Sequence, residues 1–165
     1  EHFEIALPEH IEACARMGIY LSMQPQFDEL WGGEGRMYDD RLGTERMRSM
    51  NALGRIARSG AMLCGGDDSP VCDLNPLAGM QACVDHHEPS ERLTPAQALA
   101  MYTCNPAQMA FVENETGRIA PGYAADFAVL DREPLEDAGF AACTVLQTWC
   151  DGAVIANAAE PSLQA

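Results

Sequence analysis

The sequence predicts an α/β fold followed by a small antiparallel sheet, and three observations carry this prediction. Helical patterns alternate with short apolar runs over the first two-thirds of the 165 residues. These runs lack polar alternation, which is typical of strands buried on both faces of a parallel sheet. Near the end, an Asp-Gly pair at 151–152 separates two apolar runs, which is a strong hairpin signal.

The first helix and strand are expected at 8–18 and 19–23. Pro8 stands in the first turn of this helix, and Gly18 stands where it would end. The same order returns as a helix over 44–58 and a strand at 61–64. Because helices and buried strands alternate, we expect parallel strands joined by crossover helices.

Three later helices are expected to begin at a capping side chain followed by proline. The pairs are Asn75-Pro76, Thr94-Pro95 and Asn105-Pro106. Gln97 and Gln108 stand three residues after the second and third caps, a spacing that predicts capping boxes. The tail then carries strand-like runs at 126–131, 144–150 and 153–156, with Asp126 expected to stabilise the turn before its strand.

Composition argues against several classes of partner. Ten Lys and Arg against 25 Asp and Glu give a formal net charge of −15, which repels nucleic acid and anionic lipid surfaces. No apolar run approaches the ~20 residues of a membrane span, and the acidic opening is unlike a secretory signal. We therefore expect a cytoplasmic protein whose seven cysteines are reduced and hold no zinc.

The strongest chemical signal is the run Gly65-Gly66-Asp67-Asp68-Ser69-Pro70, which follows an apolar strand. Acids at the carboxyl ends of parallel barrel strands are placed for catalysis or metal binding, although two aspartates can also simply shape a turn. His2 is a second candidate, with a solvated side chain as the alternative. The run 86–88, His-His-Glu, is expected to be surface at a helix end.

These residues together resemble the closing part of metal-dependent amidohydrolases of the amidohydrolase-3, YtcJ-like group. The resemblance is carried by Glu1-His2, Gln24-Pro25, the run 66–71, Asn75-Pro76-Leu77, and the later runs 93–99, 103–107 and 117–131. It implies a partial TIM barrel over 1–111, with barrel strands at 19–24 and 61–68. It also implies the C-terminal strands of a β-sandwich subdomain over 112–165.

The resemblance further implies the roles of single residues. His2 and Asp68 would be metal ligands, Asp68 would be the catalytic acid, and Gln24 and Arg46 would line the substrate pocket. The family has Gly-Ser-Asp where this chain has Gly66-Asp67-Asp68, so which aspartate faces the site stays open. For Arg46 the alternative is a helix-surface pair with Asp39 or Asp40.

The implied activity is hydrolysis of a non-peptide or cyclic amide C–N bond by water activated on a divalent metal, with zinc expected. The chain does not begin with Met, and the family's other metal ligands would precede Glu1. We therefore expect part of a longer enzyme that is inactive alone and self-associates through exposed strand edges. The alternative is a non-catalytic binding or scaffold module built on the same half-barrel.

Overall fold

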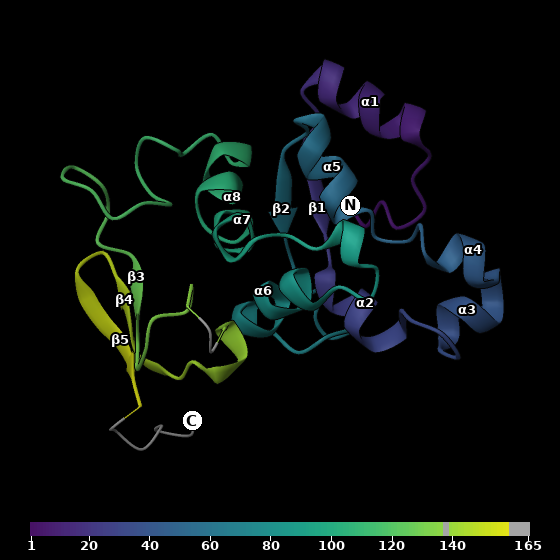
Figure 1. The fold of residues 1–165 in the computed structure, drawn as a ribbon. Helices are drawn as coiled ribbons and strands as arrows, with labels where there is room; N and C mark the ends of the chain where they lie inside the picture. Colours follow the sequence, from purple (N-terminus) through teal and green to yellow (C-terminus); the bar gives the residue numbers. More distant parts are fainter. Residues whose placement is uncertain (137–138, 159–165) are drawn as a thin grey trace.

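The computed structural model describes residues 1–136 and 139–158 and contains two small sheets among many short helices (Figure 1). The helices are α1 (Pro8–Met17), α2 (Pro25–Trp31), α3 (Met37–Leu42), α4 (Thr44–Met47), α5 (Leu53–Ser59), α6 (Pro76–Asp85), α7 (Pro95–Met101) and α8 (Cys104–Met109). The strands are β1 (Leu21–Met23), β2 (Leu63–Gly65), β3 (Phe127–Leu130), β4 (Val145–Cys150) and β5 (Ala153–Asn157). Two 3-10 turns lie at Pro89–Glu91 and Phe140–Ala142.

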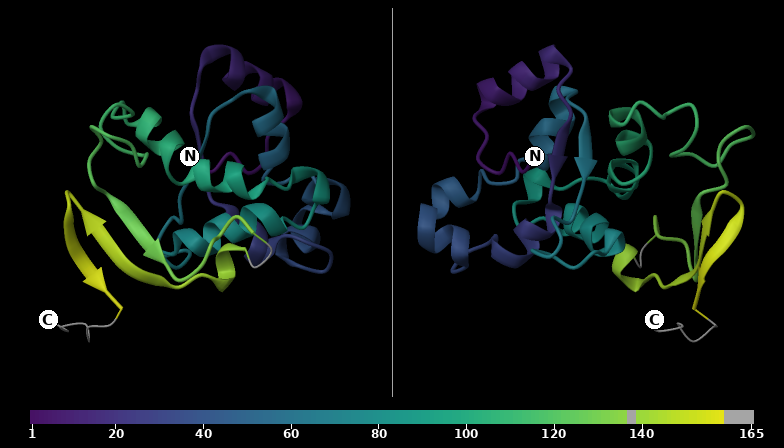
Figure 2. Two further views of the ribbon diagram at one scale, coloured as in Figure 1. Left: turned by 60° about the vertical axis from the view of Figure 1, so that its left-hand side comes forward. Right: turned by 180° about the vertical axis from the view of Figure 1, so that it is seen from behind.

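The parallel pair of strands confirms the predicted α/β crossover. β1 lies beside β2 in register, from Leu21 opposite Leu63 to Met23 opposite Gly65. Their carboxyl ends point toward α2 and α6, while α7 and α8 lie next to β2 (Figure 2). The strands are shorter than the expected 19–24 and 61–68, and membership of a closed barrel stays a prediction.

The core fills the space between this pair and its helices. Met23, Leu53, Ile56, Cys83 and Met101 have no exposed surface. A second, smaller apolar cluster joins Tyr38, Met47 and Met50 beside α3 and α4. In the described part of the chain, no helix is long and apolar enough to cross a bilayer.

The predicted helix over 44–58 is wrong in one respect, because it is broken into α4 and α5. Between them the chain turns at Asn51, which has φ +48°. The Asn51 N–H donates to the Glu4 carbonyl at 2.9 Å, and Met50 forms a bridge with Ile5. Pairing with this N-terminal segment therefore replaces the helical hydrogen bonds.

Capping was predicted correctly for two of the three later helices. Asn75 accepts the Ala78 N–H at the start of α6, and Thr94 with Gln97 forms the complete capping box of α7. The third prediction was wrong, because α8 begins at Cys104 and the Asn105 side chain donates instead to the Leu63 carbonyl at 2.8 Å.

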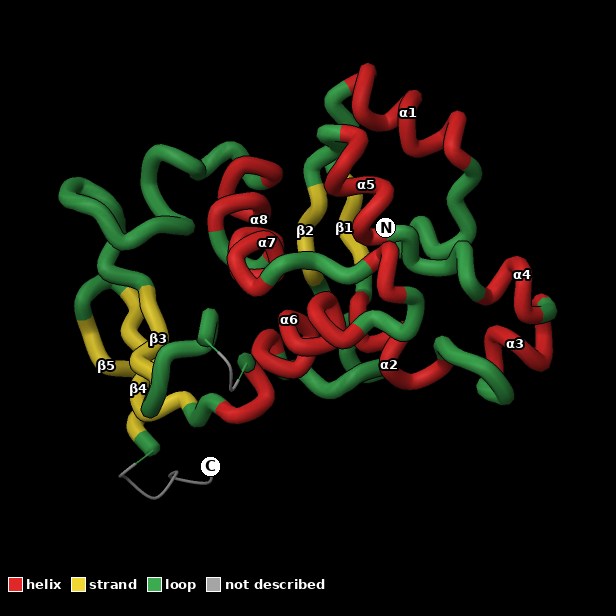
Figure 3. The backbone as a smooth tube through the Cα atoms, in the orientation of Figure 1, coloured by secondary structure: helices red, strands yellow, loops and turns green. Residues whose placement is uncertain are grey.

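The tail forms the expected antiparallel sheet in the order β3-β4-β5, set apart from the parallel pair (Figure 3). Asp151-Gly152 makes the turn between β4 and β5. Asp126 precedes β3, but its carboxylate accepts the Asp151 N–H at 2.7 Å, so it supports the turn between β4 and β5, and the predicted role in the turn before β3 stays a prediction. Part of the predicted 112–165 unit, at 137–138 and 159–165, lies outside the described residues, and the division at residue 111 stays a prediction.

Candidate functional site

The carboxyl ends of β1 and β2 bring several predicted site residues to one edge of the parallel pair. Gln24 follows β1 directly, and Gly66 follows β2. The Gly66 N–H donates to the Met23 carbonyl at 3.0 Å, which holds the two strand ends together. The Gln24 side chain is buried and passes over Gly66, where an added Cβ would lie 3.5 Å from Nε2.

His2 lies alongside β1 and is held there by main chain and side chain. Its N–H donates to the Ser22 carbonyl at 2.9 Å, and its Nδ1 lies 2.9 Å from Gln24 Oε1. Gln24 Nε2 in turn donates to the Glu1 carboxylate at 3.3 Å. Because the amide oxygen of Gln24 can only accept, a neutral His2 ring in this position carries its proton on Nδ1.

That tautomer leaves His2 Nε2 with a free lone pair. Metal-binding histidines usually donate their other ring N–H to an oxygen acceptor that fixes the ring, which is the arrangement His2 has with Gln24. The ring also stacks on Phe27 with centroids 6.0 Å apart. The arrangement therefore suits a metal ligand, and Gln24 is the residue that orients it.

The two adjacent aspartates have different surroundings. Asp67 is 6% exposed, and its carboxylate accepts a hydrogen bond from Gln26 Nε2 at 3.0 Å. Asp68 is exposed, has φ +51°, and its carboxylate has no hydrogen-bond partner among the described residues. Of the two, Asp68 is the one whose carboxylate is free to meet a metal or a substrate.

The structure does not bring Arg46 to this edge. Arg46 lies on α4 and is exposed, and its backbone carbonyl accepts hydrogen bonds from Arg48 and Ser49. Its expected surface pair with Asp39 is not formed either, because that carboxylate accepts from the Thr44 hydroxyl and the Gly35 N–H. Those two hydrogen bonds lower the pKa of Asp39.

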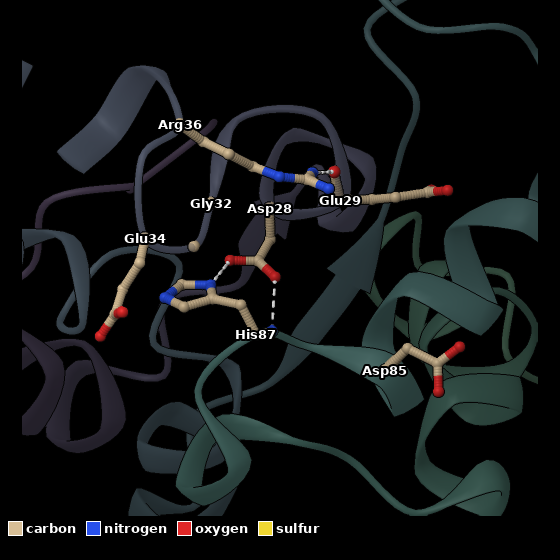
Figure 4. Close-up of a pocket in the computed structure, with 8 residues that line it drawn as sticks. Asp28, Glu29, Gly32, Glu34, Arg36, Asp85 and His87 are labelled. Atoms are coloured by element: carbon tan, nitrogen blue, oxygen red, sulfur yellow. Dashed lines mark hydrogen bonds and ion pairs between the residues drawn. The ribbon is translucent and has the colours of Figure 1, made fainter. Parts of the chain in front are cut away.

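A second polar cluster joins α2 to the segment after α6. Asp28 is 2% exposed, and its carboxylate meets His87, as Figure 4 shows, and also His86, whose ring stacks on that of His87 with centroids 4.8 Å apart. His86 Nε2 lies 3.3 Å from Asp28 Oδ1, His87 Nδ1 hydrogen-bonds the same oxygen, and the His87 N–H donates to Oδ2 at 3.0 Å. Burial lowers the pKa of His86, against the opposing effect of the Asp28 charge.

The prediction that these histidines are surface residues was wrong for His86. Its ring is fully buried, with Nε2 3.0 Å from the Asn51 carbonyl, because the chain turns inward directly after α6. His87 borders a cavity of about 330 Å³ that is also lined by Glu29, Glu34 and Asp85. Two adjacent histidines in a chain that has four were the only sequence signal for this cluster.

The strand ends and the histidine cluster differ in how many metal ligands they offer. In the part of the chain that the structure describes, Asp28, His86 and His87 are the one group of three histidine, cysteine or carboxylate side chains whose ligand atoms lie within 4.8 Å of one another. His2 and Asp68 therefore offer at most two ligands at the strand ends, whereas catalytic zinc sites usually have three protein ligands. Imidazole and carboxylate are nevertheless ligand types that zinc takes, and neither His2 Nε2 nor the Asp68 carboxylate is hydrogen-bonded among the described residues.

Comparison with known proteins places the chain in a class of metal-dependent hydrolases. A solved metal-dependent hydrolase of unknown function from Pyrococcus furiosus superposes with a TM-score of 0.71 at 27% identity, over 82% of this chain and 28% of that one. A second solved structure, of an uncharacterized metal-dependent hydrolase from Pyrococcus horikoshii, has a similar fold, with a TM-score of 0.68 at 24% identity over 81% of this chain and 28% of that one.

The family follows from the sequence matches. The model of the amidohydrolase family, Amidohydro_3, matches residues 1–156, and the chain belongs to this family. "Putative amidohydrolase YtcJ" of Bacillus subtilis is 36% identical over 81% of this chain and 26% of its own length. The N-substituted formamide deformylase of Arthrobacter pascens is 30% identical over 92% of this chain and 29% of its own length. The chain thus spans roughly a quarter of the length of these relatives.

Proposed function

We propose that this chain contributes the last two barrel strands, and with them part of the active site, of an enzyme that hydrolyses C–N bonds in small amides, imides or cyclic amides. The observation that carries the proposal is the pairing of His2 with Gln24. It leaves Nε2 of His2 free at the strand edge from which the free Asp68 carboxylate also emerges.

The divalent metal, which we propose to be zinc, would be held by His2 and Asp68 together with ligands from outside residues 1–165. When bound, it would lower the pKa of a water molecule from 15.7 to about 7. Asp68 would take the proton of that water and pass it to the departing amine, a role typically worth about 10²- to 10⁴-fold in rate. Gln24 would keep the His2 ring in the tautomer that ligation needs.

A chimaera provides the test. This chain would replace the matched part of the Arthrobacter deformylase, and amine release from an N-substituted formamide would be followed. We expect the chimaera to be active, Asp68→Asn to abolish the activity, and Asp67→Asn to retain most of it. An active Asp68→Asn chimaera with bound metal would contradict the assignment of Asp68.

For the chain alone we propose that it has no amidase activity, because two ligands bind a catalytic metal weakly. Zinc-dependent hydrolysis by the purified 165-residue chain that is lost in Asp68→Asn would show this to be wrong.

Self-association is a separate proposal. Among the described residues β5 pairs with β4 alone, and Val154 and Ile155 on this strand are exposed. Unpaired edges with apolar side chains favour pairing with a second chain. Light scattering should therefore find a dimer or larger species, and replacement of Ile155 by lysine should convert it to monomer. A wild-type monomer at high protein concentration would contradict the proposal.

A further inference from the structure

We propose that Asp28, His86 and His87 bind a divalent transition-metal ion at a site that uses neither His2 nor Asp68. One carboxylate oxygen and two imidazole nitrogens lie within 4.8 Å of one another. Imidazole and carboxylate ligands together suit zinc and its first-row neighbours. Asp28 and His87 are 59 residues apart in sequence and are brought together because α2 packs against α6.

The charge of the cluster calls for a cation. The Asp28 carboxylate is 2% exposed, and the two imidazoles are the only described groups that lie within ion-pair distance of it. Arg36 reaches the same cavity, but its guanidinium donates to the Glu29 carbonyl and not to Asp28. A buried carboxylate is costly without a positive partner, and a divalent ion would provide one.

Hydrogen bonding at His87 leads to the same conclusion. Its Nε2 is buried and has no hydrogen-bond partner among the described residues. If the neutral ring carries its proton on Nδ1, the Nε2 lone pair receives no donor; if the proton is on Nε2, the lone pair of Nδ1 faces the Asp28 oxygen. A metal ion held by Nδ1 and that oxygen would relieve this second case, with the ring proton kept on Nε2, which has no acceptor among the described residues.

Gly32 leaves these ligand atoms open to the cavity. An added Cβ at Gly32 would lie 2.5 Å from Asp28 Oδ1 and 2.6 Å from His87 Nδ1, so any larger residue would cover the pair. The cavity of about 330 Å³ has room for water ligands, and Glu29 and Glu34 on its wall would attract a cation.

His86 would contribute less than the other two residues. Its Nδ1 accepts the Glu88 N–H at 3.1 Å, so in the metal-free chain the ring proton is on Nε2, which lies 3.0 Å from the Asn51 carbonyl and 3.3 Å from Asp28 Oδ1. Ligation through Nε2 requires the proton to move to Nδ1, and both the hydrogen bond from Glu88 and the one to the Asn51 carbonyl would be lost. We therefore expect Asp28 and His87 to dominate affinity.

The test is calorimetric titration of the full chain with Zn²⁺ and, separately, Ni²⁺, with histidine ring NMR signals recorded during the titration. We expect one ion per chain, with shifts at His86 and His87. His87→Gln should abolish binding, and His86→Gln should weaken it about 10- to 100-fold, the range typical of supporting groups. His10→Gln, which alters an exposed histidine on α1, is the matched control and should have no effect.

The Gly32→Ala variant tests the site without removing a ligand and should also weaken binding. Thermal unfolding without metal would establish that each variant is folded. A titration without a stoichiometric ion, or binding that survives in His87→Gln but is lost in a His2→Gln, Asp68→Asn double variant, would overturn the proposal. The latter result would still support a metal at the strand ends, so the two proposals fail separately.

Discussion

Gly65 at the end of β2 is packed against Tyr102, and this contact allows a stability prediction. A methyl group added at Gly65 would lie 2.5 Å from Tyr102 Cζ and 2.7 Å from Cδ2. The ring cannot simply withdraw, because its other side meets Gly79, where an added Cβ would lie 2.6 Å from the same Cζ. The Tyr102 ring thus fills a slot between β2 and α6.

The expected cost of Gly65→Ala can be estimated from this geometry. To restore an ordinary carbon contact, the ring would have to move by about 1 Å. Overpacking of this kind costs about 1–3 kcal/mol, and a slot closed on both sides places it near the upper end. Removal of a strand glycine returns roughly 0.5–1 kcal/mol, so we expect a net loss of about 2 kcal/mol. For a chain of this length that is a fall in Tm of roughly 4–8 °C.

Thermal and urea unfolding followed by circular dichroism would measure this loss. Gly66→Ala is the matched control, since its added Cβ would meet the nearest atom at 3.5 Å, and we expect a change within about 0.5 kcal/mol. In a Tyr102→Leu background the cost of Gly65→Ala should shrink, which gives a coupling of about 0.5–3 kcal/mol. Equal stability of Gly65→Ala and wild type, or equal costs in both backgrounds, would refute the reasoning.

Other predictions concern a buried ion pair, a helix cap and a thiol. Glu91→Ala should lower the free energy of unfolding, measured in urea, by about 2–3 kcal/mol. It removes a buried carboxylate that accepts hydrogen bonds from Arg55 Nε at 2.5 Å and from the Arg55 backbone N–H at 2.8 Å. The loss is smaller than the roughly 3–5 kcal/mol of fully buried pairs because Arg55 is partly exposed. Thr94→Ala should cost about 1 kcal/mol by the same measurement, and Thr94→Ser should cost little, since serine keeps the capping oxygen. Burial raises the pKa of Cys64 to about 11, so only about one Cys64 thiol in 1,000 is ionised at pH 8. Alkylation of Cys64 should therefore be far slower than that of the exposed Cys150, and raising the pH toward 11 should speed up the reaction at Cys64. Equal alkylation rates of the two thiols in the folded chain would contradict this prediction.

Much of the fold was accessible from the sequence because its signals are local. The capping box at Thr94 needs only residues 94–97, and the turn at 151–152 needs only its two flanking runs. The alternation of helix and apolar run likewise predicted the parallel pair of β1 and β2. Such patterns act within a few residues and require no knowledge of distant partners.

The errors arose where a distant segment competed with a local preference. The helix over 44–58 breaks because Asn51 pairs with Glu4, and Asn105 leaves its expected cap to reach the Leu63 carbonyl. His86 is buried because its ring meets Asn51, 35 residues earlier in the chain. None of these partners can be identified from spacing, because each depends on how the elements pack.

The same limit explains why the choice between Asp67 and Asp68 stayed open in the sequence. Alternation along a strand would place the two side chains on opposite faces, but β2 ends at Gly65, and Asp68 has the left-handed φ of a turn. What separates the aspartates is therefore the hydrogen bond from Gln26, which ties Asp67 to α2 and leaves the next carboxylate free. We therefore expect Asp67, which takes the place of the family's serine, to position the loop that carries Asp68. An asparagine at 67 keeps an oxygen for Gln26 and an alanine does not, so in the chimaera Asp67→Ala should lower activity more than Asp67→Asn.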